Sequence, residues 1–445
     1  MGIAQELATF VCGCSADRLP APDRGILRRH MADVVVARIA GSSTREGRAV
    51  AALYPRSAGL HTLAGLAGMV RLTEIDDIHI ESCTTPSSVA VPVALGLAGF
   101  GDKAVGPDVL ASAIWAGTEL TVRLGKAISG ASVLYQGVWP TRAGAALGAA
   151  AAACRMWGLD EQRTAHALAF AVMLTNGRAG RFAGEPSGRW LLFAETMSAG
   201  LRAAEAARAG FKSDPASLER AWLERSLGVP VDIAQLTAGL GATSVFPELS
   251  LKPVCTSRQA LSPTAAMRDA MADGLDPADV TSIHVRVPTA YAGMISMRLD
   301  PAQRGSSYVS AGGQLALAAL APDHLYDVAR DKVLANRQIQ RFAGLIKVEA
   351  DPSLDAMFPK RWPAQIEIET RSGKVIVKRV EDAPGDPARR LDDAALQAKW
   401  EAVLAHIDRP AFAARLMALS GEAMRDPAAA SRMAGIFLSE GLPDA

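Results

Sequence analysis

The first 250 residues of the chain follow a mainly helical pattern of hydrophobic and polar positions. Apolar residues recur at helical spacing in residues 104–126, 141–156 and 194–210, and Gly, Pro or Asp separates such stretches. Residues 144–154 consist almost only of Gly and Ala. Side chains this small let neighbouring elements approach closely, so we expect this helix in the middle of a bundle.

The pattern changes near Lys252 to a mixture of strands and helices. Residues 281–287 alternate between polar and apolar side chains, as a half-buried strand does. Three further segments have strand character, and they are residues 346–349, 365–369 and 374–378. The last two flank a short segment with Gly373, which predicts a hairpin. Helical spacing is found between the strands, at residues 262–273, 308–320 and 324–342.

These patterns predict a mainly α protein built of two domains and a tail. A chain of 445 residues exceeds the size at which a single core stops growing. We expect a large all-helical domain at residues 1–253 and a smaller α+β lid domain with an antiparallel sheet at residues 254–388. Residues 389–445 predict a helical tail that returns to the helical domain. Pro and Gly mark residues 382–392 as the linker before this tail.

Composition and charge exclude several classes of protein. Hydrophobic residues make up 49% and charged residues 21%, which is typical of a globular chain. The net charge is +1, so we expect neither a nucleic-acid partner nor binding to an anionic membrane. We expect no secretory signal, because no basic segment precedes an apolar run near Met1, and the longest apolar stretch is too short to span a bilayer. We therefore expect a cytoplasmic protein.

Neither a metal nor a cofactor is predicted. The five cysteines are odd in number and contain no Cys-x-x-Cys pair, which fits a reducing compartment without disulfides or a zinc site. No strand precedes the glycine-rich residues 177–188, so a dinucleotide site is not expected. Five histidines have no partner at metal-ligand spacing and are not candidates: His30, His61, His166, His324 and His406.

One short polar loop gathers groups that can transfer protons. Asp76, Asp77 and His79 lie close together in the sequence, before a helix that Thr85 and Pro86 would begin. Carboxylate and imidazole groups at such spacing can tune each other's pKa. Short polar loops also cap the local backbone, so a purely structural role stays open.

Three residues elsewhere are candidates for binding or proton transfer. Lys252 precedes Pro253 at the predicted junction of the domains, where clefts commonly form. Arg189 ends a segment rich in Gly and Arg, residues 178–189, which suits an anion clamp or, equally, a surface loop. Tyr308 stands at the start of a predicted helix and is either an acid or base of the lid domain or a packing residue.

The order of these features resembles the MmgE/PrpD family. Five stretches carry the resemblance in the family's order, and they are residues 72–88, 137–141, 194–211, 250–255 and 306–308. The family includes 2-methylcitrate dehydratase, cis-aconitate decarboxylase and iminodisuccinate epimerase. The resemblance implies a homodimer that works without a cofactor at the α-carbon of a small polycarboxylate.

Three positions depart from the family pattern. Thr85 and Trp139 stand where much of the family has histidines, and Arg189 stands where it has a lysine. The decarboxylase resemblance relies on those two histidines, so we expect a different activity. The main hypothesis is a lyase that dehydrates a small hydroxy-polycarboxylate, similar to 2-methylcitrate dehydratase. The alternatives are an epimerase or isomerase of a related dicarboxylate and, less favoured, a non-catalytic family member.

The chemistry assigns roles to the candidate residues. Removing a proton beside a carboxylate builds up negative charge, so the site needs a base and fixed cations. The catalytic candidates implied by the resemblance are Asp77, His79, Lys252 and Tyr308. The substrate-binding candidates are Asp76, Thr85, Trp139 and Arg189, since an arginine is suited to bidentate recognition of carboxylates.

Overall fold

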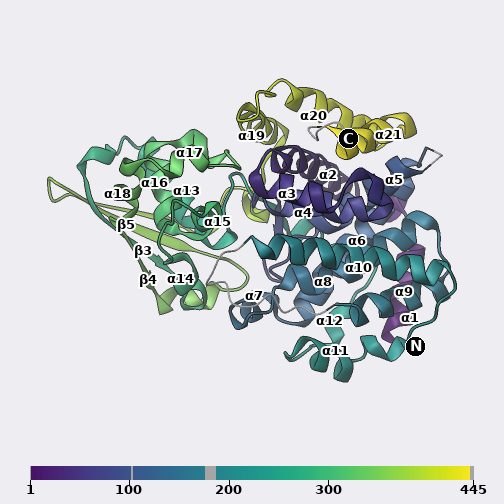
Figure 1. The fold of residues 1–445 in the computed structure, drawn as a ribbon. Coiled ribbons are helices and arrows are strands. Elements are labelled where there is room, and N and C mark those ends of the chain that lie inside the picture. The colour runs from purple at the N-terminus through teal and green to yellow at the C-terminus, as the bar shows by residue number, and fades with distance from the viewer. Residues whose placement is uncertain (1, 102–103, 176–186, 441–445) are drawn as a thin grey trace. The chain divides into compact units, whose positions relative to one another are not determined.

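The computed structural model describes residues 2–101, 104–175 and 187–440, and the chain forms two compact units (Figure 1). Unit 1 comprises residues 1–249 and 411–445, and unit 2 comprises residues 250–410. Helices dominate both units, and unit 2 also contains a small sheet. The expected class, mainly α with a smaller sheet-containing region, is confirmed.

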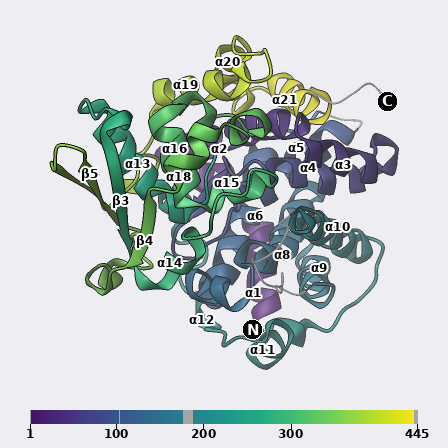
Figure 2. The same cartoon turned by 60° about the vertical axis from the view of Figure 1, so that its left-hand side comes forward.

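Unit 1 is a bundle of helices joined by short turns. Its helices are α1 (Ile3–Gly13), α2 (Ala21–Ser42), α3 (Arg45–Leu53), α4 (Thr62–Arg71), α5 (Ser87–Phe100), α6 (Pro107–Ala127), α7 (Gly130–Val133), α8 (Pro140–Trp157), α9 (Glu161–Met173), α10 (Gly188–Arg208), α11 (Arg220–Leu227), α12 (Ala234–Thr237), α20 (Phe412–Ala423) and α21 (Pro427–Ser439). The helices expected at residues 104–126, 141–156 and 194–210 are confirmed as α6, α8 and part of α10. Near the C-terminus, α20 packs against α2, and α21 against α5 (Figures 1 and 2).

The alanine-rich helix α8 lies at the centre of this bundle. It begins with Pro140, is capped after Trp157 by Gly158 in the left-handed conformation, and packs against α5, α6, α9 and α10. A Cβ atom added at Gly148 would overlap Thr121 Oγ1 and lie 2.6 Å from the carbonyl oxygen of Gly117, both in α6. The predicted close approach of neighbouring helices is therefore confirmed, because no larger residue fits between α8 and α6 at this point.

Unit 2 is built on a four-stranded sheet with the order β4-β3-β5-β6. The strands are β3 (Val280–Val287), β4 (Ile346–Ala350), β5 (Ala364–Thr370) and β6 (Val375–Val380). Ile283, Val285 and Val287 of β3 are fully buried on one face. Helices α13 (Arg258–Ala272) and α16 (Ala311–Leu320) pack against the sheet (Figure 2). The remaining helices of unit 2 are α14 (Thr289–Ile295), α15 (Arg304–Val309), α17 (Asp331–Leu334), α18 (Arg337–Ala343) and α19 (Asp393–Ala405).

The sheet is mixed, which corrects the expectation of an antiparallel one. The predicted hairpin of β5 and β6 is confirmed, and β5 is also antiparallel to β3. Strand β4, however, runs parallel to β3, with Ile283 opposite Ile346. The chain between them forms helices that return it to the same end of the sheet, and such a crossover connects parallel strands.

Two helices expected in unit 2 are interrupted. Ser310 divides residues 308–320, because its side chain accepts a hydrogen bond from the amide of Gly313 and caps α16. The prediction of one continuous helix at residues 324–342 is wrong. Arg330 has a positive φ of 55°, and Asn336 caps the start of α18, so the segment forms short helical pieces instead. Ser and Asn compete with the helical backbone through such local hydrogen bonds.

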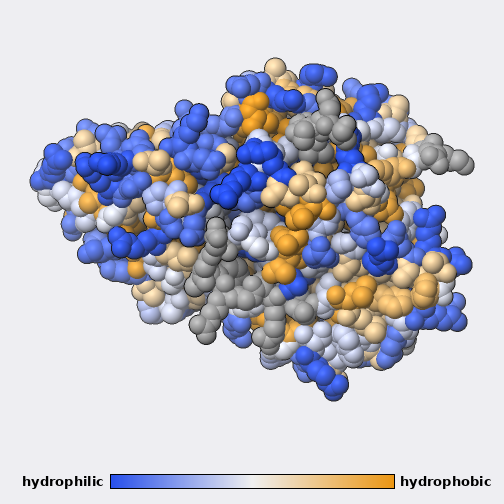
Figure 3. All heavy atoms as spheres, in the orientation of Figure 1, coloured by the Kyte–Doolittle hydropathy of each residue, from blue (hydrophilic) through white to orange (hydrophobic). Residues whose placement is uncertain are grey.

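The surface carries no extended apolar area on the side shown in Figure 3, where hydrophobic residues form small groups between hydrophilic ones. Within the described part of the chain, no helix combines the length and the apolar character that crossing a membrane requires. All five cysteines are described, and each is a free thiol.

The close packing of α8 predicts opposite effects of alanine at two helical glycines. Gly148→Ala should lower the free energy of unfolding by about 1–3 kcal/mol, because the methyl group overlaps α6. Gly435→Ala, in α21, meets no atom within 4 Å and should instead raise stability by up to about 1 kcal/mol through helix propensity. Urea unfolding of both variants checks this, and equal effects would contradict the assigned packing.

Candidate active site

The end of α4 and the loop that follows it bury five ionisable side chains within nine residues. They are Arg71, Glu74, Asp76, Asp77 and His79, and none is more than 6% exposed. The predicted acidic loop therefore exists, and His79 is buried rather than solvated. Burying charge is costly unless each charged group has a partner, so the contacts within this loop determine what it can do.

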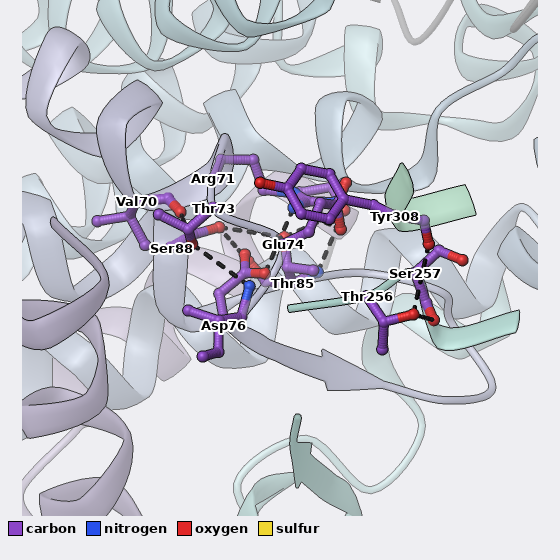
Figure 4. Close-up of polar contacts among 12 residues, drawn as sticks. Val70, Arg71, Thr73, Glu74, Asp76, Thr85, Ser88, Thr256, Ser257 and Tyr308 are labelled. Atoms are coloured by element: carbon purple, nitrogen blue, oxygen red, sulfur yellow. Dashed lines mark hydrogen bonds and ion pairs between the residues drawn. The ribbon is translucent and has the colours of Figure 1, made fainter. Parts of the chain in front are cut away.

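Arg71 pairs with two carboxylates of the loop (Figure 4). Its Nη2 donates to Glu74 Oε1 at 3.1 Å, and its Nη1 lies 3.3 Å from Asp76 Oδ1. Burial by itself would lower the pKa of Arg71, but the carboxylates of Asp76 and Glu74 outweigh burial and raise it. Glu74 has a positive φ of 53°, a strained conformation for a residue with a side chain, and strain of this kind is concentrated at functional sites.

Two tryptophans and a second arginine adjoin this cluster. The rings of Trp139 and Trp190 meet edge to face, 6.2 Å apart. The guanidinium carbon of Arg189 lies 4.9 Å and 4.8 Å from the two ring centroids, and that of Arg71 lies 5.6 Å from each. Burial lowers the pKa of Arg189 to about 10, so this guanidinium is still cationic at neutral pH. Arg189 Nη2 is 4.0 Å from Glu74 Oε1.

Asp77 belongs to the short strand β1 (Asp77–His79), and its side chain lies at the start of α5. Its Oδ2 accepts hydrogen bonds from Ser87 Oγ at 2.6 Å and from the Ser87 amide at 3.1 Å. His30, in α2, places Nδ1 3.0 Å from Ser87 Oγ and 3.4 Å from Asp77 Oδ2. A carboxylate at a helix N-terminus is stabilised by the helix dipole. Asp77 thus fixes the loop to α5, whatever its part in catalysis.

Both ring nitrogens of His79 have partners. Nδ1 accepts a hydrogen bond from the Ser82 amide at 3.1 Å, which places the ring proton on Nε2, 2.7 Å from Glu248 Oε2. Lys126 Nζ lies 2.6 Å from the same Glu248 oxygen. Burial lowers the pKa of His79, so the ring is neutral at neutral pH. The hydrogen bond from His79 lowers the pKa of Glu248 to about 2 against the effect of burial, and Lys126 contributes.

The structure places Thr85 at the base of α5 rather than at its cap. The helix begins at Ser87 with Pro86 in the cap position. The amide of Thr85 donates to Thr141 Oγ1 at 3.1 Å, and Thr85 Oγ1 lies 3.1 Å from Ser88 Oγ. Thr85 therefore links the loop to the first turn of α8, where Trp139 is the N-cap residue.

Lys252 and Tyr308 belong to unit 2. The Lys252 side chain is buried, directly after the strand β2 (Leu249–Leu251). Tyr308 is fully buried in α15, and its hydroxyl donates to the carbonyl oxygen of Val328 at 2.6 Å. Burial raises the pKa of Tyr308, and guanidinium groups of Arg304 and Arg330 lie 5.3 Å and 4.7 Å from its ring. Its carbonyl accepts from the Ser257 amide (Figure 4).

Sequence reasoning missed several partners of the candidate residues. Glu248 and Lys126 are far from His79 in the sequence, and Trp190 and His30 follow an ordinary helical pattern, so no sequence signal identifies them. Arg71 directly precedes the acidic loop, and its position was a usable signal. Of the segment at residues 178–189, the part up to residue 186 lies outside the described residues, so only its end with Arg189 can be placed.

Comparison with known families agrees with the order of the chain. A model of the MmgE/PrpD N-terminal domain matches residues 5–225, and a model of the MmgE/PrpD C-terminal domain matches residues 257–418. No curated protein matches the chain. The two matched ranges cover most of the sequence and include all the candidate residues except Lys252.

The buried ion pairs of Arg71 predict a large loss of stability when this side chain is replaced. Arg71→Met should lower the free energy of unfolding by about 3–5 kcal/mol, because Glu74 and Asp76 lose a buried partner. Arg163→Met removes an exposed pair with Asp160 and should cost less than about 1 kcal/mol. Urea unfolding measures both, and a small effect at Arg71 would contradict its role as the partner of the carboxylates.

The lowered pKa of His79 predicts a pH dependence of stability. The unfolded chain binds this proton near the ordinary pKa of 6.5 and the folded chain only at lower pH, so stability falls as the pH drops below about 6.5. One such group contributes a slope of up to about 1.4 kcal/mol per pH unit. His79→Gln should therefore flatten the profile between pH 7 and pH 5 in urea unfolding, whereas His166→Gln should not. Parallel profiles for all three proteins would refute this.

Proposed function

Because the chain belongs to the MmgE/PrpD family, a family of dehydratases and related lyases, we propose that it is a hydro-lyase that needs no cofactor. Its substrate class is a small hydroxy-polycarboxylate, as for 2-methylcitrate dehydratase. The supporting observation is the buried loop of unit 1 with Arg71, Glu74, Asp76, Asp77 and His79. Buried ionisable groups whose partners shift their pKa are found at functional sites more often than elsewhere.

His79 is the proposed base. Its proton lies on Nε2 and points to Glu248, so Nδ1 carries the lone pair. In this structure the lone pair accepts the hydrogen bond from the Ser82 amide. When the loop releases that amide, Nδ1 can take the α-proton of the substrate. The resulting imidazolium is stabilised by the Glu248 carboxylate, as in other histidine–carboxylate pairs.

The electron pair of the broken C–H bond forms the new C=C bond, and the hydroxyl group departs as water after it takes a proton from an acid. Tyr308 is the proposed acid, and Asp77 is a second group proposed to take part in proton transfer. The cations Arg189 and Lys252 are proposed to bind substrate carboxylates, since the negative charge that develops during proton removal requires fixed positive groups. Asp76, Thr85 and Trp139 complete the proposed binding residues of the chain.

An epimerase of a related dicarboxylate is the second candidate. An epimerase returns a proton to the opposite face of the carbon and expels no group, so it does without an acid for a departing hydroxyl. The contact of Arg189 with Trp139 favours this candidate, because it places an arginine against an aromatic ring where the family pattern has a lysine and a histidine. An arginine and an aromatic ring can bind and orient a dicarboxylate, but they add no proton donor for a departing hydroxyl.

Proton NMR of the purified protein in D₂O tests the proposal. The panel contains 2-methylcitrate, citrate, cis-aconitate, malate, tartrate and iminodisuccinate. The dehydratase predicts the signals of a new unsaturated acid, together with deuterium at the α-position of a hydroxy acid. For 2-methylcitrate these are the shifted methyl and methylene signals, because its product carries no vinylic proton. Deuterium that enters recovered substrate without an alkene indicates the epimerase. Absence of both signals from folded protein would contradict either activity on this panel.

Substitutions then separate the roles with the active substrate. His79→Gln should lower kcat by about 100- to 10,000-fold, as loss of a general base does, and His166→Gln serves as the matched control. Arg189→Met and Lys252→Met should raise KM more than they lower kcat. An unchanged kcat in folded His79→Gln would remove His79 from the mechanism and leave Asp77 as the alternative base.

A further inference from the structure

Three potential metal ligands meet on the surface of unit 2, outside the residues considered for catalysis. They are His324, Asp327 and His406, and one ligand atom from each lies within 4.8 Å of the others. His324 and Asp327 are three residues apart, around the short 3-10 turn Pro322–Leu325. His406 immediately follows α19. The sequence predicted no metal site here, because the second histidine is far from the first along the chain.

The distances suit a single small cation. His324 Nδ1 lies 3.2 Å from Asp327 Oδ2. Two ligands of one tetrahedral Zn²⁺ ion, each about 2.0–2.1 Å from the metal, are about 3.3 Å apart. The imidazole rings of His324 and His406 lie 5.4 Å apart between centroids and are tilted by 40°. His406 is exposed at the surface, where its side chain can adjust to an ion.

The surrounding backbone holds this group of ligands in place. Asp327 Oδ1 accepts a hydrogen bond from the Ala329 amide at 2.8 Å, so Oδ2 is directed to His324. The buried Arg330 donates through Nε to the carbonyl oxygens of His324 and Asp327, at 3.2 Å and 3.1 Å. These bonds fix the backbone that carries two of the ligands, and contacts that hold ligands in place raise the affinity for a metal.

A backbone carbonyl orients the third ligand. The carbonyl oxygen of Asp323 lies 2.9 Å from His406 Nε2. It accepts the imidazole N–H, as carbonyls commonly do beside metal-bound histidines. Two imidazoles with a carboxylate favour zinc and similar divalent transition metals over magnesium or calcium.

We propose that His324, Asp327 and His406 form a zinc-class divalent metal site that fastens the end of α19 to the turn after α16. The site lies wholly in unit 2, and its existence does not depend on the proposed enzyme activity. Its expected effect is structural, since a ligand that binds only the folded state stabilises that state.

The test is calorimetric titration of zinc chloride into the tag-free, EDTA-treated full chain near pH 7.5, with thermal unfolding as a second readout. The proposal predicts one Zn²⁺ per chain and a higher Tm with zinc. His406→Ala should lose this binding, and Asp327→Asn, which keeps the bond to Ala329, should weaken it by about 10- to 100-fold.

His284→Ala is the matched control. His284 also pairs with a carboxylate, Glu349 at 3.2 Å, but belongs to no group of three ligands in the part of the chain that the structure describes. This variant should bind zinc as the unmodified chain does. Equal binding by the unmodified chain and by both folded site variants, or no binding by the unmodified chain, would overturn the proposal.

Discussion

The pairing of buried charges in the loop of residues 71–79 is the constraint on which the account of unit 1 depends. These groups are buried in a helical bundle rich in alanine and leucine, where water cannot hydrate them, so each needs a partner from the protein. Arg71 pairs with Glu74 and Asp76, and the first amide of α5 donates to Asp77. Glu248 is hydrogen-bonded to His79. Burial keeps the imidazole of His79 neutral, and the carboxylates beside Arg71 keep its guanidinium cationic.

Packing of small residues brings two further candidate residues of unit 1 together. Helix α8 packs closely on α10 because Gly200 approaches the backbone of Ala146. Trp139 precedes α8 and Arg189 lies in the first turn of α10, so the same packing puts the guanidinium on the indole. The departures from the family at these two positions therefore form one physical contact. A cation stacked on a tryptophan is stabilised where burial would otherwise oppose its charge.

Periodicity predicted the helices of unit 1, the β5–β6 hairpin and the mainly α class, because these depend on local patterns. It missed the parallel pairing of β4, which depends on the path of a long crossover, and the break of the helix between the positive φ of Arg330 and the cap at Asn336. The motifs identified Asp76, Asp77, His79, Trp139 and Arg189, and these lie in unit 1 among buried polar contacts. Their partners Glu248 and Trp190 are brought to them only by folding, and so is the meeting of His406 with His324.

The central claim is that the buried loop of unit 1 binds a small polycarboxylate. The most direct test is a crystal structure of the protein with propane-1,2,3-tricarboxylate, which has the carboxylates of the proposed substrate class but no hydroxyl group to lose. The account predicts a ligand carboxylate within hydrogen-bond distance, about 2.7–3.2 Å, of Arg189 or of the side chains of residues 71–79. A ligand bound elsewhere, with these residues unchanged and out of its reach, would contradict the account.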